Sequence, residues 1–291
     1  MNVSIQNEAL AVTIASKGAE LQSIRSKDGT EYLWQGDPAY WTSHAPNIFP
    51  YVARLTEGKY WLNGKTYGFG NHGLVRYEDL VVEAQSDSSV SFRLDADEGT
   101  KEKYPFDFTY HMTYSLKGNV LQMETVIENK GSERMFFAVG GHPGFNVPMA
   151  EGTSFEDYRI EFEQEAHPYR IILADSGAVT PGQERYEMKD RAIPLQHSLF
   201  DHDAIVLVNA SRRASICSDL TSRKVTVSYP DFRYVGFWHK PCTDAPYVCI
   251  EPWTSLPSRE GIVEDLSLQG DLIALDAGRE WRTVWSIQID E

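Results

Sequence analysis

Glu251 is the first residue of this sequence whose surroundings point to chemistry. It follows the apolar run Tyr247-Val248-Cys249-Ile250 and precedes Pro252-Trp253. A carboxylate at the end of a buried strand loses its hydration, so it must be paired with a cation or used in a reaction. A salt bridge to an arginine explains Glu251 in isolation, and a functional role requires partners from elsewhere in the chain.

Three further groups lie in similarly unusual backbone. His142 lies in AVGGHPGFNVP (138–148), where glycine and proline predict a strand end that breaks into an irregular turn. His72 lies in the turn-like Asn71-His72-Gly73, and Arg54 ends the segment PNIFPYVAR. Taken singly, these are explained as a core histidine, a turn histidine and a surface charge. Their joint occurrence with Glu251 favours one assembled site.

An imidazole and a carboxylate together can act as general acid and general base. The sequence has no HExxH or paired Cys/His motif for a metal, no GxSxG elbow for a nucleophilic serine, and no phosphate-binding or dinucleotide-binding glycine loop. We therefore expect neither a metal nor a cofactor. The remaining histidines lie mostly in polar surroundings and are expected at the surface, His197 and His239 among them.

The elements that must position these residues are strands. Period-2 alternation and turn signals recur in 3–34, 88–97, 106–131, 215–240 and 280–290, and no amphipathic run has the helical period. Residues 106–131 predict a hairpin that turns at Lys117-Gly118-Asn119. No linker or repeat divides the chain, so we expect one all-β domain over 1–291. Its irregular segments are predicted at 40–58, 68–78, 140–155, 175–203 and 240–262.

The composition limits the partners and the compartment. The 291 residues carry a formal net charge of −15, which disfavours nucleic acid and anionic membranes as partners. Three cysteines give no disulfide framework, the first residues lack a basic and apolar signal, and no apolar run reaches the ~18 residues of a spanning helix. We expect a cytoplasmic protein that is a monomer or a homodimer.

The four segments resemble those of the aldose 1-epimerase (galactose mutarotase-like) superfamily, and most closely its LacX-type branch. The resemblance rests on FPYVARLTEGKYWLNGKTYGFGNHGLVR, GGHPGFNVP and VCIEPW, in the family's order across residues 10–285. It implies a β-supersandwich of large antiparallel sheets with an open cleft on a concave face. It also implies an isomerase that interconverts the α and β anomers of an aldose without a cofactor.

The resemblance also assigns roles, residue by residue. Glu251 matches the family's catalytic base, His142 its catalytic acid and His72 its second site histidine. Arg54 matches a site arginine. For an aspartate that binds sugar hydroxyls, the sequence LFDHDAIVL offers Asp201 and Asp203.

Asp203 is preferred at this position because Asp-Ala-Ile-Val is the usual LacX-type context. Trp253 is a candidate platform under the sugar ring, with a core tryptophan as the alternative. Three positions depart from patterns of the superfamily: Gly144 stands where galactose mutarotases proper have a tyrosine, Leu74 where a phenylalanine is common, and Ala53 where a glycine often precedes the arginine.

We expect this site to act on a hexose or a related sugar. Exposure in an open cleft is expected to keep Glu251 ionised, and the nearby carboxylate to keep His142 protonated. Two alternatives remain open: a mutarotase of hexose phosphates, with basic candidates such as Arg54, Lys59, Arg76 and Arg259, and a non-catalytic carbohydrate-binding protein. A glycosidase needs two flanking carboxylates and ranks lowest.

Overall fold

The hairpin predicted over 106–131 is present, and antiparallel strand pairs of this kind make up most of the chain. β9 (Phe108–Lys117) and β10 (Val120–Asn129) pair antiparallel from Lys117–Val120 outward, and Gly118 holds φ 56° in the turn. Every second side chain of β10 is buried over most of its length. The computed structural model describes all residues 1–291, and strands form nearly all of its regular structure.

The larger of two main sheets has nine strands in the order β17-β14-β19-β20-β24-β10-β9-β8-β7, all antiparallel. β24 fills the predicted last strand 280–290, and β8 falls within the predicted 88–97. The remaining strands of this sheet are β7 (Val81–Gln85), β8 (Ser89–Asp95), β14 (Tyr158–Phe162), β17 (Ala192–Pro194), β19 (Arg213–Ser218), β20 (Thr221–Ser228) and β24 (Glu280–Asp290).

The second sheet carries the residues of interest. Its eight strands follow the order β16-β15-β18-β21-β22-β12-β4 with β13 beside β22. They are β4 (Asn47–Ile48), β12 (Gly140–Gly141), β13 (Gly144–Asn146), β15 (Tyr169–Leu173), β16 (Val179–Arg185), β18 (Ile205–Val208), β21 (Tyr234–Trp238) and β22 (Tyr247–Trp253). β18 and β22 are buried along their whole length, so both of their faces are covered.

Smaller elements close the ends of the two sheets. They are a three-stranded sheet of β1 (Asn2–Gln6), β2 (Leu10–Ala15) and β3 (Leu21–Ser26), and the pairs β5 (Tyr60–Leu62) with β6 (Lys65–Tyr67) and β11 (Met135–Phe137) with β23 (Ile273–Leu275). The single α-helix is α1 (Glu98–Lys103), capped by Asp97 and Thr100 in a capping box. Single 3₁₀ turns lie at η1 (Thr56–Gly58), η2 (Val75–Tyr77), η3 (Phe155–Asp157) and η4 (His197–Phe200).

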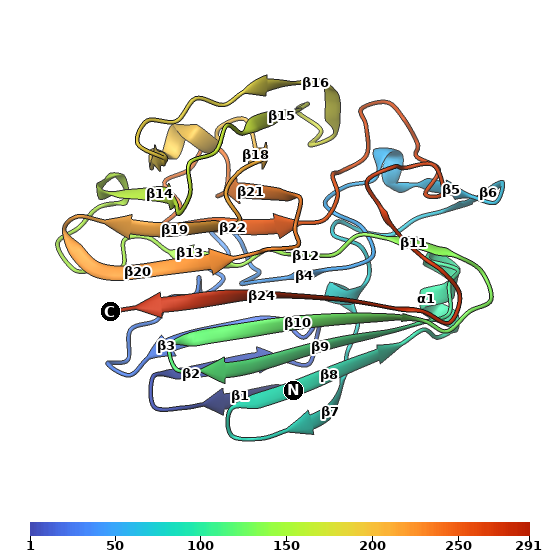
Figure 1. Cartoon of the computed structure of the whole chain (residues 1–291), viewed down its shortest axis with the longest axis horizontal. Helices are drawn as coiled ribbons and strands as arrows, with labels where there is room; N and C mark the ends of the chain where they lie inside the picture. Colours follow the sequence, from blue (N-terminus) through green and yellow to red (C-terminus); the bar gives the residue numbers. More distant parts are fainter.

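The two main sheets form stacked layers (Figure 1). One cluster of 62 buried apolar residues draws on both of them, with Tyr110 from β9 and Ile250 from β22 among its members. The all-β prediction and the β-supersandwich architecture are confirmed. The shared core supports the single-domain organisation that we propose for residues 1–291.

The predicted loops need correction. Of the segments expected to be irregular, 175–203 contains β16 and β17, 140–155 contains β12 and β13, 40–58 contains β4, and 240–262 contains β22. Most of these strands are short or, in β16, mostly exposed, and β22 is buried on both faces, so none shows the apolar alternation by which strands are identified in sequence.

We predict that Gly73→Ala destabilises the protein more than Gly64→Ala. Both glycines have positive φ, 82° and 74°, which costs an alanine about 1–2 kcal/mol. A Cβ at Gly73 would lie 2.3 Å from the Phe49 carbonyl oxygen, whereas a Cβ at Gly64 meets nothing within 4 Å. The clash should add about 1–3 kcal/mol, measured by urea unfolding. Equal losses in both variants would show that the close approach to Phe49 costs nothing.

Candidate active site

Successive side chains of strand β22 point to opposite faces of the sheet. Val248 and Ile250 point into the main core, whereas Tyr247 and Cys249 belong to a small aromatic cluster on the other face. Glu251 lies on the face of Tyr247 and Cys249 because successive side chains of a strand alternate. The apolar run before Glu251 is therefore the signature of a strand that is covered on both faces.

His142 lies where the neighbouring strand is interrupted. Gly140 of β12 pairs with Trp253, and Gly144 of β13 pairs with Cys249, so His142 and Pro143 fall between the two paired stretches. The His142 amide donates to the Pro46 carbonyl at 3.0 Å. Its Nε2 lies 3.3 Å from Oε2 of Glu251. The irregular turn predicted at 140–148 is thus a break within a strand, and the break faces Glu251.

His72 is held in one orientation and one tautomer. It has φ 63°, and its Nδ1 accepts a hydrogen bond from the Ala53 amide at 3.2 Å. Burial lowers the pKa of His72 well below its usual value, and His142 and Arg76 add to the effect. The ring is therefore neutral with its proton on Nε2. Its centroid lies 5.1 Å from that of His142, edge to face.

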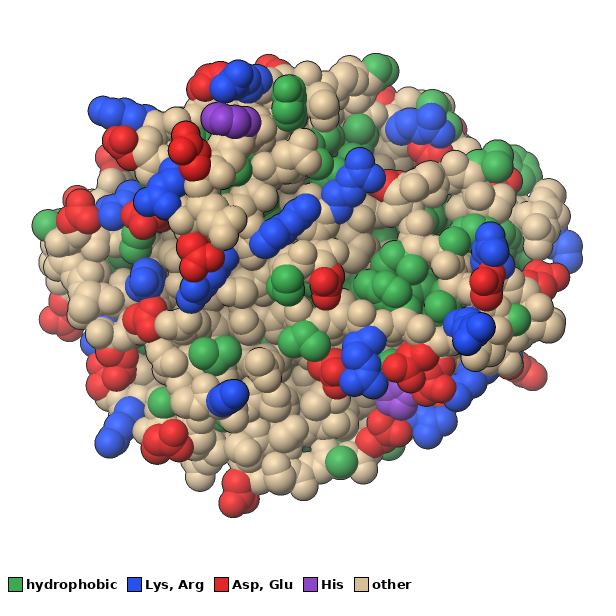
Figure 2. All heavy atoms as spheres, viewed as in Figure 1, with side chains coloured by type: hydrophobic (Ala, Val, Ile, Leu, Met, Phe, Trp, Pro, Cys, Tyr) green, Lys and Arg blue, Asp and Glu red, His purple; other side chains and the backbone are tan.

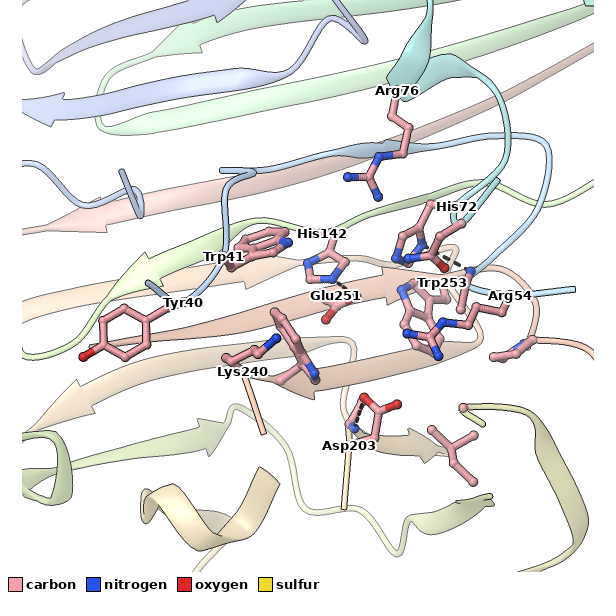
Figure 3. A pocket seen from close by; sticks show the side chains of 17 residues that line it. Tyr40, Trp41, Arg54, His72, Arg76, His142, Asp203, Lys240, Glu251 and Trp253 are labelled. Carbon is pink, nitrogen blue, oxygen red and sulfur yellow. Dashed lines mark hydrogen bonds and ion pairs between the residues drawn. The ribbon is translucent and has the colours of Figure 1, made fainter. Parts of the chain in front are cut away.

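Arg54 and Asp203 complete the polar lining of the same pocket (Figure 3). The exposed Arg54 donates from Nη1 to the Ser176 carbonyl at 3.2 Å, and Asp203 accepts from the Ala204 amide at 2.9 Å. Asp201, the alternative to Asp203, is exposed and does not line this pocket.

All six residues singled out from the sequence line this one pocket: Arg54, His72, His142, Asp203, Glu251 and Trp253. Trp253 is only 3% exposed and packs in a second apolar cluster with Ile48 and Val52. Its indole Nε1 is buried without a hydrogen-bond partner in the protein. Trp253 is therefore both a core residue and part of the pocket wall, where its Nε1–H is a hydrogen-bond donor without a partner.

Sequence reasoning did not place several pocket residues at the site. Trp41 and Trp238 line it as aromatic walls, and Tyr40 and Lys240 lie at its rim. Arg76 was treated as a surface charge or a phosphate contact and is also on the lining. The position of Trp238 and Lys240 at the end of β21, beside β22, is the one signal that could have found them.

The charge states of the central pair differ from our expectation. Glu251 is 1% exposed and His142 7% exposed, so both are largely removed from solvent although they line the pocket. Burial lowers the pKa of His142 to about 3, with Arg76 adding to the effect. Burial raises the pKa of Glu251 well above its usual value, and Asp203 acts in the same direction. The expectation of two charged groups was wrong because it assumed exposure; desolvation favours the neutral forms.

Three buried polar atoms of the pocket have no hydrogen-bond partner within the protein. They are Nδ1 of His142, Oε2 of Glu251 and Nε1 of Trp253. Buried polar groups are normally paired, because an unpaired one costs about 1–3 kcal/mol. Their concentration at one point is the arrangement expected of a pocket whose polar groups bind a ligand.

His239 corrects another expectation. It was expected at the surface but is fully buried, and burial lowers its pKa to about 4. Its Nδ1 lies 2.8 Å from the Lys240 carbonyl and its Nε2 lies 3.1 Å from Nδ1 of His197. The backbone bond at Nδ1 requires a proton there, so His197 is the donor in the second contact. The pair supports the backbone that carries Lys240.

Three potential metal ligands cluster at the buried side of the pocket, two of them on its lining. One donor atom each from His142, Cys249 and Glu251 lie within 4.8 Å of one another, and all three residues are buried. Burial raises the pKa of the Cys249 thiol well above its usual value, so the protonated, weakly ligating form is favoured. A metal on these atoms would occupy the imidazole and the carboxylate together.

Outside the pocket, cationic and anionic side chains are interspersed over the face seen in Figure 2. None of the helices has the length and hydrophobicity needed to cross a bilayer.

The sequence matches the family model described as Aldose 1-epimerase over residues 1–288. The chain belongs to the aldose 1-epimerase family. It is 31% identical to the chromosomal and plasmid forms of protein LacX from Lactococcus lactis subsp. lactis, over 96% of this chain and 97% of those proteins. The proposed relation to the LacX-type branch is thereby confirmed.

Two solved structures have nearly the same fold. The galactose mutarotase related enzyme from Lactobacillus acidophilus is 34% identical with a TM-score of 0.95, over 100% of this chain and 98% of that one. A galactose mutarotase-like protein from Lactobacillus casei ATCC 334 is 31% identical with a TM-score of 0.94, over 99% and 100%. The fold implied by the four sequence segments is therefore that of this chain.

We predict that Glu251→Gln raises the thermal stability at neutral pH. A carboxyl group whose pKa is raised in the folded state stabilises the fold while protonated, below about pH 4.5, and this stabilisation is lost as the pH rises through the folded-state pKa. Glutamine stays neutral, so Tm at pH 8 should rise by about 3–5 °C, and the gain should vanish near pH 4.

Glu264→Gln is the matched control for this measurement. Glu264 is also buried, but its hydrogen bonds to Arg259 outweigh burial and lower its pKa. Its contribution is present above the unfolded-state pKa and lost in acid, so Glu264→Gln should lower Tm at pH 8. Stabilisation by both variants, or by neither, would contradict the assigned direction for Glu251.

Proposed function

We propose that this protein is an aldose 1-epimerase that interconverts the α and β anomers of a hexose or related sugar through ring opening. The observation that carries the proposal is the buried pair of His142 and Glu251, whose Nε2 and Oε2 atoms lie 3.3 Å apart, while Nδ1 of His142 has no hydrogen-bond partner within the protein. Membership of the aldose 1-epimerase family supports the same reaction class.

Ring opening needs two proton transfers at neighbouring atoms of the sugar. The proton on O1 must leave, and O5 must gain one as the C1–O5 bond breaks. Glu251 acts as the base toward O1 and His142 as the acid toward O5. After rotation about C1–C2 the two transfers reverse and the ring closes on the other face. Each group of this kind contributes about 10²–10⁴-fold to the rate.

The resting state of the pair explains how two neutral groups provide an acid and a base. The pair has the same total number of protons in two states: protonated Glu251 beside neutral His142, and ionised Glu251 beside protonated His142. Transfer of that proton over 3.3 Å therefore converts the resting pair into the reactive one. In the reactive form the carboxylate is a strong base and the imidazolium a strong acid, because burial disfavours both charges.

Other pocket residues bind and orient the sugar. His72 presents Nε2–H and Trp253 presents its unpaired Nε1–H, so both are donors to sugar oxygens. Asp203 and Arg54 line the pocket and each makes one backbone hydrogen bond, through Oδ1 and Nη1, so that Oδ2 of Asp203 and Nη2 of Arg54 are left for hydroxyl groups. None of these steps needs a cofactor or a metal, since no electrons or groups are transferred.

We further propose that the protein works in the cytoplasm, as a monomer or homodimer, with the sugar as its only obligatory partner. All three cysteines are free, which is consistent with a reducing compartment. Its net charge of −15 argues against nucleic acid as a partner.

We predict that Glu251→Gln and His142→Asn each lower the rate of mutarotation by about 10²-fold or more, because each removes one proton-transfer group. Polarimetry on a freshly dissolved α-hexose, without added cofactor and after EDTA treatment, measures the rate. Arg54→Ala should mainly raise KM, since an arginine positions hydroxyls and transfers no proton.

Two results would change this assignment. An unaltered rate for Glu251→Gln would show that Glu251 is not the base. If the wild type accelerates no aldose or aldose phosphate yet binds a sugar, the protein is a carbohydrate-binding member of the family.

A second candidate, a mutarotase of hexose phosphates, is favoured by the charges on the pocket. Arg54, Arg76 and Lys240 all line it, and none of them has a carboxylate within 4 Å. Two other basic candidates are not available: Lys59 pairs with Glu57 at 3.4 Å and Arg259 with Glu264 at 2.7 Å. Unpaired cations in a strongly acidic protein suit an anionic sugar.

For this candidate we predict that Arg76→Met and Lys240→Met raise KM for a hexose 6-phosphate by about tenfold each, or about 1.4 kcal/mol, while KM for the free hexose stays within about twofold. The two substrates are compared at low ionic strength, where screening is weak. An equal change for both sugars would contradict a phosphate-binding role and favour the neutral hexose.

A further inference from the structure

Gly144 marks the position where the family pattern has a tyrosine, and the structure shows what occupies the space. A Cβ at Gly144 would lie 3.1 Å from Cζ3 of Trp41 and 3.2 Å from Cβ of Trp34. The glycine therefore admits an indole from a segment about one hundred residues earlier. The space beside Gly144 is therefore filled by Trp41 and Trp34.

Trp41 covers the imidazole of the proposed acid. Its ring stacks on that of His142 with centroids 4.7 Å apart and planes 28° apart, and it also packs on Tyr247 at 5.8 Å. Trp238 contacts His142 edge to face at 5.4 Å. The Nδ1 of His142 has no hydrogen-bond partner, so the ring is restrained by packing on its aromatic neighbours and by the contact of Nε2 with Glu251.

The backbone of Trp41 is anchored by hydrogen bonds through Trp34. The Trp41 carbonyl accepts from Nε1 of Trp34 at 2.8 Å, and the Trp34 amide donates to the Gly144 carbonyl at 2.9 Å. Trp34 thus connects the Trp41 segment directly to β13.

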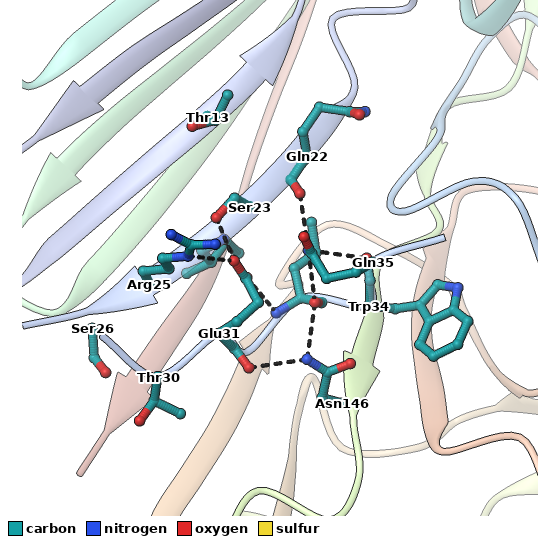
Figure 4. A network of polar contacts seen from close by, with 12 residues as sticks. Thr13, Gln22, Ser23, Arg25, Ser26, Thr30, Glu31, Trp34, Gln35 and Asn146 are labelled. Atoms are coloured by element: carbon teal, nitrogen blue, oxygen red, sulfur yellow. Dashed lines mark hydrogen bonds and ion pairs between the residues drawn. The ribbon is translucent and has the colours of Figure 1, made fainter. Parts of the chain in front are cut away.

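A polar network fixes the segment that precedes Trp34 (Figure 4). Asn146 of β13 donates from Nδ2 to the Glu31 and Leu33 carbonyls, each at 3.0 Å. The Glu31 carboxylate accepts from the amides of Ile24 at 2.8 Å and Leu33 at 3.0 Å. The position of Trp41 therefore follows from the fold of 24–34 and β13.

We propose that Trp41 is a positioning residue: it holds the imidazole of His142 with Nε2 toward Glu251 and keeps water from the pair. The expected effect on kcat rests on the proposed mutarotase activity. The expected effect on the titration of His142 does not. Trp238 shares the wall, yet only Trp41 lies parallel to the ring and fixes its plane.

The test compares Trp41→Ala with Trp41→Phe, with Trp61→Ala as the control for loss of an exposed tryptophan outside the pocket. Trp41→Ala should lower kcat by about 10–100-fold with KM changed by less than about threefold, since misplacing a catalytic group costs this much. Trp41→Phe keeps an aromatic face and should recover kcat to within about threefold of wild type. Trp61→Ala should behave as wild type.

A second readout needs no substrate. NMR titration of the His142 ring, assigned with His142→Asn, should show its pKa rising toward 6.5 in Trp41→Ala, because water then reaches a ring whose pKa burial had lowered. Trp41→Phe should leave the titration near that of wild type.

The outcomes separate the two proposals. If the wild type accelerates no sugar, the proposed function is wrong, and the titration alone decides the role of Trp41. An unchanged titration in Trp41→Ala overturns the positioning role, whatever the rate. A loss of kcat that is equally large in Trp41→Phe also overturns it, because the indole would then act through contacts other than stacking.

Discussion

The burial of one titratable pair is the constraint on which the rest of this structure depends. Glu251 and His142 reach 3.3 Å only because β12 and β13 stop pairing with β22 at the same point. An isolated carboxylate on a fully covered strand would be costly, and a second titratable group at hydrogen-bonding range shares its proton. The break in the neighbouring strand, the glycines around it and the aromatic wall over it all serve this contact.

The backbone near the pocket shows a second consequence of this constraint. Ala53, His72 and Asp203 all adopt positive φ, at 50°, 63° and 77°, although none is glycine. Such residues cost about 1–3 kcal/mol each and persist where the surrounding structure over-determines them. The His72–Ala53 hydrogen bonds, from amide to carbonyl and from amide to ring, are what maintain two of the three.

Local signals in the sequence predicted much of the fold. Contacts between segments far apart in the chain could mostly not be predicted. The hairpin of β9 and β10 follows from alternation and a Gly-Asn turn, both readable within 25 residues. The place of Trp41 on the pocket depends on which distant segments β13 and β22 bring together, and nothing in its own neighbourhood encodes that. The protonation of Glu251 was predicted wrongly for a related reason, since burial is a property of the folded chain.

The alternation of side chains along β22 has a consequence for which substitutions this protein can accept. Its even positions, Val248 and Ile250, are committed to the main core, while Tyr247, Cys249 and Glu251 face the aromatic wall and the pocket. Folding and ligand recognition are thus encoded on the same seven residues but at alternating positions. Of the odd positions only Glu251 and Trp253 reach the pocket, so substitutions at the even positions act on the core and substitutions at these two act on the pocket, within one architecture.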